Sequence, residues 1–124
     1  VVNLGTGRTA TAITARRSHS CAILDNTFVK CWGNNRNGQL GIGSTDNMGD
    51  NSSEMGDNLP VVNLGTGRTA TAIATGDDHT CAILDNASIK CWGANDSGQL
   101  GIENTTHMGD DSGEMGDNLP AIDF

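Results

Sequence analysis

The sequence predicts an all-β chain built from two tandem copies of one 60-residue unit. Residues 1–60 (unit 1) and 61–120 (unit 2) are identical at 42 of 60 aligned positions, and self-similarity at a fixed period is the signature of a repeat array. Within each unit, short runs rich in Val, Ile, Cys and aromatic residues alternate with turns rich in Gly, Asn and Asp, which is typical of β-strands. No long segment shows the 3.6-residue periodicity of a helix.

Four short strands are predicted for each repeat. Three of them lie at residues 10–15, 20–24 and 28–32, with counterparts at 70–75, 80–84 and 88–92. A fourth run, 61–64, follows Pro60 and has its counterpart at 121–124. The second and third strands flank the three-residue turn 25–27, and this arrangement predicts a hairpin. Repeated groups of four short antiparallel strands are typical of β-propeller blades.

The repeat boundaries define the predicted organisation of the chain. Unit 1 covers 1–60, unit 2 covers 61–120, and 121–124 begins a third unit because AIDF follows the pattern of VVNL. Only 3% of the residues are aromatic, whereas 17 are Gly, so each unit has too few core residues to stand alone. We therefore expect the units to stack on further repeats of the same array or on other copies of the chain.

The charge balance excludes two classes of partner. Fifteen acidic residues against seven Lys and Arg give a formal net charge of −8. Affinity for nucleic acids and for anionic membranes comes largely from cationic side chains, and the sequence contains no basic run. No apolar stretch approaches the 18 residues of a membrane-spanning helix. Nucleic acid and membrane are therefore not expected as partners, whereas a protein or a glycan is compatible with this composition.

The residues around each hairpin resemble the repeat of the regulator of chromosome condensation family. The strings HSCAILDNTFVKCWGNNRNGQLGIG and HTCAILDNASIKCWGANDSGQLGIE contain that family's His, Trp-Gly-x-Asn and Gly-Gln-Leu-Gly positions. The matching residues of unit 1 are His19, Trp32, Gly33, Asn35, Gly38, Gln39, Leu40 and Gly41. Those of unit 2 are His79, Trp92, Gly93, Asn95, Gly98, Gln99, Leu100 and Gly101. The resemblance covers the whole chain and implies a structural role for these residues within a propeller of about seven blades.

The resemblance also implies how the strands are shared between blades. In that family, the run after the long loop is the last strand of its own blade. Residues 61–64 then complete the first blade, 121–124 complete the second, and 1–4 form an orphan N-terminal strand. The predicted fold is therefore two tandem four-stranded antiparallel blades of a propeller-like array plus that orphan strand. A simple closed ring of identical chains is disfavoured, because residues 1–4 would compete with 121–124 of a neighbour.

The four cysteines are expected to form two disulfides, Cys21–Cys31 and Cys81–Cys91. Each pair is equidistant from the centre of a hairpin turn, which places its members directly opposite each other on two strands. Opposed Cβ atoms lie roughly 4.5–5.5 Å apart, a distance that a disulfide closes with modest adjustment. The alternative is a metal site that combines His19 or His79 with the thiols, although zinc ligands usually come at closer spacing. Paired cysteines resemble the secreted, bacterial-like branch of the family and favour an extracellular, cell-surface or periplasmic location.

The long acidic loops are candidates for calcium binding. Their carboxylates are Asp50, Glu54, Asp57, Asp110, Asp111, Glu114 and Asp117, and calcium takes six to eight oxygen ligands. Their spacing fits neither a helix-flanked calcium loop nor the nonapeptide calcium repeat. A solvated acidic loop is the favoured interpretation, and no metal or cofactor is predicted.

Three other features have both a functional and a structural interpretation. Trp32 and Trp92 are either stacking platforms for a ligand or, as the resemblance implies, packing residues between blades. His19 and His79 occur once per unit and are expected to make structural hydrogen bonds. Arg16 and Arg17 align with Gly76 and Asp77, so a charged site shared by both units is not expected. Four sequons are candidate glycosylation sites, at Asn51, Asn86, Asn95 and Asn104.

The favoured function is a non-catalytic, secreted binding or scaffold module. No Ser or Cys nucleophile is paired with a base in either unit, so an enzyme is not expected. The alternative is a structural subunit of an extracellular head-to-tail assembly or filament. Guanine-nucleotide exchange activity is the least favoured interpretation, because the inserted wedge on which it depends in the founding member is absent from this sequence.

Overall fold

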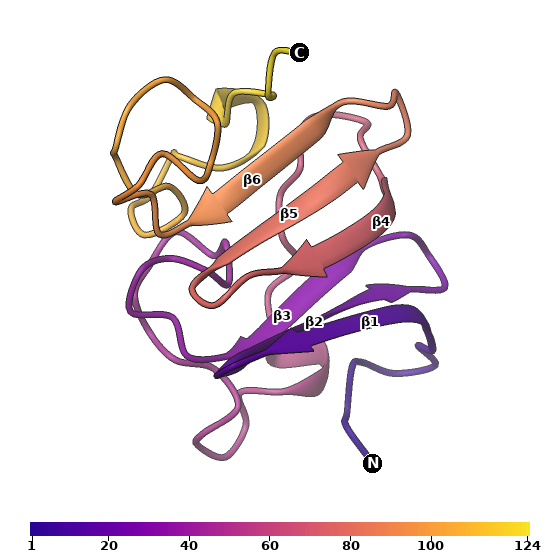
Figure 1. The fold of residues 1–124 in the computed structure, drawn as a ribbon. Coiled ribbons are helices and arrows are strands. Elements are labelled where there is room, and N and C mark those ends of the chain that lie inside the picture. Colours follow the sequence, from indigo (N-terminus) through magenta and orange to yellow (C-terminus); the bar gives the residue numbers. More distant parts are fainter.

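The computed structural model describes residues 1–124 and contains six strands in two antiparallel sheets (Figure 1). The first sheet has the order β1 (Ala10–Arg16), β2 (His19–Leu24), β3 (Val29–Gly33). The second has the order β4 (Ala70–Thr75), β5 (His79–Leu84), β6 (Ile89–Gly93). A single 3₁₀ turn ends each long loop, η1 (Gly56–Asn58) and η2 (Gly116–Asn118). The structure contains no helix that is long and apolar enough to cross a bilayer.

The hairpins have the register that the turn predicts. Cys21 lies opposite Cys31, and Ser20 lies opposite Trp32. Because side chains alternate between the two sides of a strand, each sheet has two distinct faces. We call one the Cys face; its residues are Cys21, Ile23, Val29 and Cys31 in unit 1 and Cys81, Ile83, Ile89 and Cys91 in unit 2. We call the other the Trp face; its residues include Ser20, Ala22 and Trp32 in unit 1 and Thr80, Ala82 and Trp92 in unit 2.

The hairpin turns adopt the left-handed conformation at a residue that is not Gly. Thr27 has a φ of 70° and Ala87 a φ of 68°. A Cβ atom makes this region unfavourable, so both turns carry the strain expected from the absence of Gly.

The prediction of four-stranded blades and of an orphan N-terminal strand is wrong. Each sheet has three strands, and residues 1–4, 61–64 and 121–124 form no regular strand. Residues 61–64 lie beside β3 of unit 1, where the fourth strand was expected, but Val62 N–H makes a single backbone bond, to Val29 O (2.8 Å). The next bond leaves the sheet, because Asn63 O accepts from Gly116 N–H in the loop of unit 2 (2.9 Å).

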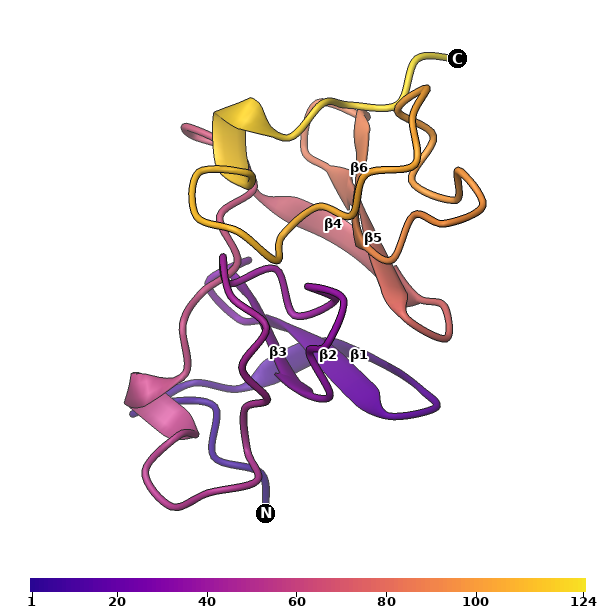
Figure 2. The same cartoon turned by 90° about the vertical axis from the view of Figure 1, so that its left-hand side faces the viewer.

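The two sheets stack on each other (Figures 1 and 2). The Cys face of unit 1 meets the Trp face of unit 2, because Thr14, in register with Cys21, contacts Thr75, which is in register with Thr80. One hydrophobic cluster of 12 buried residues spans both units. Unit 1 contributes Cys21, Ile23, Val29, Cys31 and Leu40, and the remaining members are Val62, Leu64, Ala70, Ala82, Leu84, Trp92 and Leu119. The main core therefore lies between the sheets, and neither unit encloses a core of its own.

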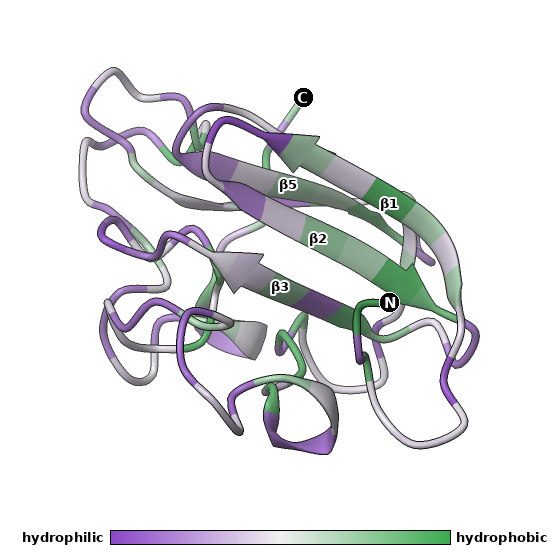
Figure 3. Cartoon of the chain, turned by 90° about the horizontal axis from the view of Figure 1, so that it is seen from below, coloured by the Kyte–Doolittle hydropathy of each residue, from purple (hydrophilic) through white to green (hydrophobic).

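Equivalent residues of the two units differ in burial. Ile23 on the Cys face of unit 1 is 4% exposed, whereas Ile83 at the same position of unit 2 is 41% exposed. The Trp face shows the reverse, since Trp92 is fully buried and Trp32 is only half-buried. Figure 3 looks onto the sheet β1–β3 from below, and hydrophobic residues run along β1 and β2 in this view. Each unit thus has one covered face and one open face.

Candidate functional site

Buried polar contacts join the two units at their junction. Gln39 O accepts two hydrogen bonds from unit 2, one from Trp92 Nε1–H (3.1 Å) and one from Thr80 Oγ1–H (2.9 Å). His19 Nε2 lies 2.9 Å from the same Thr80 oxygen. Gln39, Thr80 and Trp92 are fully buried, and His19 is 3% exposed. One backbone carbonyl of unit 1 therefore anchors two side chains of unit 2.

This arrangement fixes the tautomer of His19. The Thr80 hydroxyl donates its only proton to Gln39 O, so it accepts a hydrogen bond from His19 Nε2–H. His19 Nδ1 is then the unprotonated nitrogen, and it is buried without a hydrogen-bond partner. Burial lowers the pKa of His19 below its ordinary value of 6.5, Asp78 opposes this shift, and His79 adds to it. His19 is thus a neutral, structural histidine.

The loop that carries Gln39 requires Gly at position 41. Gly41 has a φ of 68°, and a Cβ atom there would lie 2.7 Å from Trp92 Nε1. Any side chain would therefore push the indole out of its site. This contact joins Gly41 of unit 1 to Trp92 of unit 2.

A polar rim surrounds the buried part of the junction. Thr14 Oγ1 lies 2.9 Å from Thr75 Oγ1, and Arg16 Nε donates to Asp77 Oδ1 at 2.7 Å. The hydrogen bond and charge of Arg16 hold the pKa of Asp77 below its ordinary value. The sequence argument aligned Arg16 with Gly76 and expected no charged site that both units share. The structure pairs Arg16 of unit 1 with Asp77 of unit 2, across the junction.

Two buried lysines, which the sequence argument missed, fasten the chain segment that enters each unit. Lys30 Nζ donates to Leu4 O (3.0 Å) and to Gly56 O (2.7 Å). Lys90 makes the equivalent bonds to Leu64 O and Gly116 O, and burial lowers its pKa. The signal was available, because KCWG is identical in both units and places Lys between apolar strand residues.

The cysteines are joined as Cys21–Cys31 and Cys81–Cys91. The Cα atoms of each pair are 4.1 Å apart, and no cysteine is free. Each disulfide links the two strands of a hairpin on its Cys face. The thiols are therefore not free to act as the metal ligands of the alternative interpretation.

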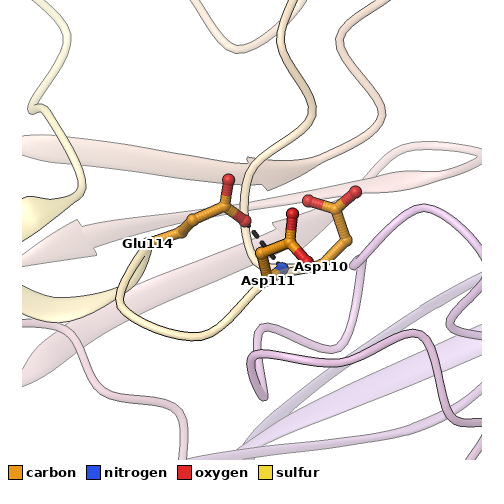
Figure 4. Close-up of side chains that lie close together, drawn as sticks. All are labelled: Asp110, Asp111 and Glu114. Carbon is orange, nitrogen blue, oxygen red and sulfur yellow. Dashed lines mark hydrogen bonds between the residues drawn. The ribbon is translucent and has the colours of Figure 1, made fainter.

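The carboxylates of the acidic loops serve different purposes. Asp110, Asp111 and Glu114 lie close together (Figure 4), with one ligand atom from each within 4.8 Å of the others. Glu114 Oε1 accepts from the backbone N–H of Asp111 (2.8 Å) and of Gly109 (3.0 Å), so it holds the loop in shape. Burial raises the pKa of Glu114.

The remaining calcium candidates do not join that cluster. Glu54 Oε2 accepts from the backbone N–H of Gly49 and Asn51 in the loop of unit 1. Asp57 Oδ2 accepts from Thr6 Oγ1–H at 2.6 Å, and hydrogen bonds from Thr6 lower the pKa of this aspartate. Asp117 repeats the contact with Thr66. Asp50 is exposed and lies in the long loop of unit 1.

The sequons are not equally accessible. Asn51, Asn86 and Asn104 are exposed. Asn95 is fully buried, its Nδ2 donates to Asn104 O (3.0 Å) and Thr106 O (2.9 Å), and its Oδ1 accepts from Leu100 N–H. Asn95 is therefore not an accessible acceptor in the folded chain, which corrects its selection as a candidate. Asn35 makes the same kind of bonds in unit 1.

Comparison with known proteins agrees with this architecture. The repeat described as "Regulator of chromosome condensation (RCC1) repeat" matches residues 11–39 and 70–99 in one form and 29–83 in another. The chain is 31% identical over 91 residues to the ultraviolet-B receptor UVR8 of Arabidopsis thaliana, covering 72% of this chain and 18% of that protein. It is 40% identical over 74 residues to an RCC1 domain-containing protein of Dictyostelium discoideum, covering 60% of this chain and 14% of the relative. The chain thus spans less than a fifth of these relatives.

Solved structures show the same fold. Prp20p of Saccharomyces cerevisiae superimposes with a TM-score of 0.68 at 18% identity, over 99% of this chain and 27% of that one. Human WBSCR16 gives a TM-score of 0.63 at 21% identity, over 82% of this chain and 25% of that one. Sequence and fold agree: the chain belongs to the RCC1 repeat family and forms two RCC1-like propeller blades.

Proposed function

We propose that the chain is a non-catalytic scaffold module that stacks blades and leaves its loops free to engage a protein or glycan partner. The junction is the observation that carries this proposal. The family-motif residues His19, Gln39, Gly41 and Trp92 are all used in contacts between units. A repeat whose characteristic residues join neighbouring repeats is built for assembly, because its stability comes from the interfaces.

The state of the reactive side chains supports a non-catalytic role. The cysteines are oxidised, and His19 is buried beside Thr80 with a lowered pKa. The disulfides also support an extracellular or periplasmic location, since they persist in oxidising compartments. The net charge of −8 supports a partner other than nucleic acid or an anionic membrane.

Native-state hydrogen exchange tests whether the junction couples the units. We expect amides of β2 and β5 to exchange with the same opening free energy, because the core lies between the sheets. Thr80→Val keeps the shape of the side chain but leaves His19 Nε2–H without its acceptor, at a cost of about 1–3 kcal/mol. The opening free energies measured for the amides of β2 and of β5 should then differ. Ser20→Val, at the half-buried equivalent position of unit 1, is the matched control.

Two results would contradict the proposal. One is separate opening of the two units in the unmodified chain. The other is an equal effect of Thr80→Val and Ser20→Val, because only Thr80 contacts the other unit in the structure.

A further inference from the structure

The hairpin turn of unit 2 carries a complete glycosylation signal, whereas the equivalent turn of unit 1 does not. Asn86, Ala87 and Ser88 form the sequon Asn-x-Ser between β5 and β6, and Phe28 occupies the position of unit 1 that aligns with Ser88. We propose that Asn86 is an N-glycosylation site that carries an oligosaccharide on its side-chain nitrogen. The inference rests on the extracellular location in the proposed function, because this modification belongs to secreted chains.

The side chain of Asn86 presents a free nitrogen. Its Oδ1 accepts hydrogen bonds from the backbone N–H of Ser88 (3.1 Å) and from the Ser88 hydroxyl (2.7 Å). These bonds hold the carboxamide in one orientation and are made to its oxygen, so neither N–H of Nδ2 is used. Asn86 is also exposed. The residue that completes the sequon therefore orients the acceptor and leaves its nitrogen accessible.

The nitrogens of the other three sequons are already engaged. Asn51 Nδ2 lies 3.4 Å from each of two carboxylates of its own loop. Asn95 Nδ2 is buried and donates to two backbone carbonyls. Asn104 Nδ2 donates to Ile102 O at 3.5 Å. Of the four sequons, that of Asn86 alone combines exposure with a nitrogen that makes no hydrogen bond.

The hairpin turn lies outside the junction between stacked units. Unit 1 shows this, because unit 2 is stacked on its sheet and yet Asp25, Thr27 and Phe28 in its turn are exposed. Asn26, the counterpart of Asn86, remains half-buried there. Figure 1 shows the β2–β3 and β5–β6 turns at the same side of the two sheets, at the right of the view. A glycan on this turn would extend from the side of the stack and leave the covered faces in contact.

The modification is a glycosyl transfer from a lipid-linked oligosaccharide. Asn86 Nδ2 attacks the anomeric carbon of a sugar that is carried on a polyprenyl diphosphate. A C–N bond forms, and the bond between the anomeric carbon and the phosphate oxygen breaks. The lipid diphosphate leaves with the electron pair of that bond, and Nδ2 releases one proton to the solvent. No oxidant or reductant takes part.

Secreted expression of the chain in a eukaryotic host tests the assignment. Protein from the medium is treated with peptide N-glycosidase, which converts a glycosylated Asn to Asp, and the converted positions are located by peptide mass spectrometry. We expect conversion at Asn86, none at Asn95, and lower occupancy at Asn51 and Asn104 than at Asn86. An untreated sample controls for spontaneous deamidation.

Two matched variants separate the sequon from the turn that holds it. Ser88→Ala removes the hydroxyl but keeps the backbone bond to Asn86 Oδ1, and it should abolish the glycan at Asn86. Phe28→Ser completes the signal in unit 1, where Asn26 Oδ1 already accepts from Phe28 N–H at 3.2 Å. It should add a glycan at Asn26. Each variant is thus expected to change the intact mass by one glycan, in opposite directions.

Three results would overturn the inference in a chain that reaches the medium with both disulfides formed. They are an unmodified Asn86, a glycan at Asn86 that survives Ser88→Ala, and an unmodified Asn26 in Phe28→Ser. Hydrogen exchange should still couple β2 and β5 in the glycosylated chain, and loss of coupling on glycosylation would contradict the placement of the turn outside the junction. A chain retained in the cell with free thiols would instead refute the extracellular location, and the inference would fall with it.

Discussion

Replacing Trp92 with Ala should cost far more stability than the same change at Trp32. Trp92 is fully buried against the loop that carries Gly41, and its Nε1–H donates to Gln39 O at 3.1 Å. Truncation of a buried Trp costs about 3–5 kcal/mol through lost transfer free energy and the cavity left behind. Trp32 is half-buried, so we expect its loss to cost about half of that or less. The comparison removes the same side chain from the same repeat position.

Urea unfolding followed by far-UV circular dichroism measures both losses. Trp92→Phe removes the Nε1–H and part of the indole but keeps an aromatic ring, so its cost should lie between zero and that of Trp92→Ala; Gln39 O keeps the bond from Thr80. Equal losses for Trp32→Ala and Trp92→Ala would refute the reasoning, because the two sites would then contribute alike despite their different burial.

Three further predictions concern the disulfides, a turn and pH. Each disulfide joins cysteines 10 residues apart in the sequence, and its reduction should lower the free energy of unfolding by about 2–3 kcal/mol in the chain-entropy treatment. Titration of the denatured, unreduced protein should find no free thiol, and four free thiols would contradict the paired structure. Ala87→Gly should stabilise the chain by up to about 1 kcal/mol in thermal melts, because Ala87 has a φ of 68°, whereas Ala74→Gly in β4 should destabilise it by about 0.5–1 kcal/mol. Stability should fall as pH drops below 6.5, because burial lowers the pKa of folded His19 and the unfolded state then binds more protons. His19→Gln should remove this acid sensitivity, and an unchanged pH profile in that variant would show that another group is responsible.

The parts of the fold that could be predicted from the sequence are those set by local geometry. Hairpin register depends on the turn and on strand alternation, so Cys21 and Cys31 could be placed opposite each other before any tertiary contact was known. Burial of Trp92 between blades was expected only from the resemblance, because one Trp per repeat is equally compatible with a ligand platform.

The fourth strand shows where local reasoning fails. Residues 61–64 have a strand-like composition, but a strand also needs a series of partners. Val62 N–H makes the one backbone bond of this segment to β3, whereas Asn63 O accepts from Gly116 N–H on the other side of the segment. The loop that holds this second side is more than 50 residues away in the sequence, so no local pattern reveals the arrangement.

By itself, the sequence determined the repeat, the all-β class, the hairpins and the opposed cysteines. These depend on period, alternation and turn length, which are properties of neighbouring residues. The tertiary structure decided which faces are covered and which groups meet across units, such as Arg16 with Asp77 and His19 with Thr80. An alignment of the repeats compares residues at equivalent positions. A junction joins opposite faces of successive units, so the residues that meet there occupy different positions of the repeat.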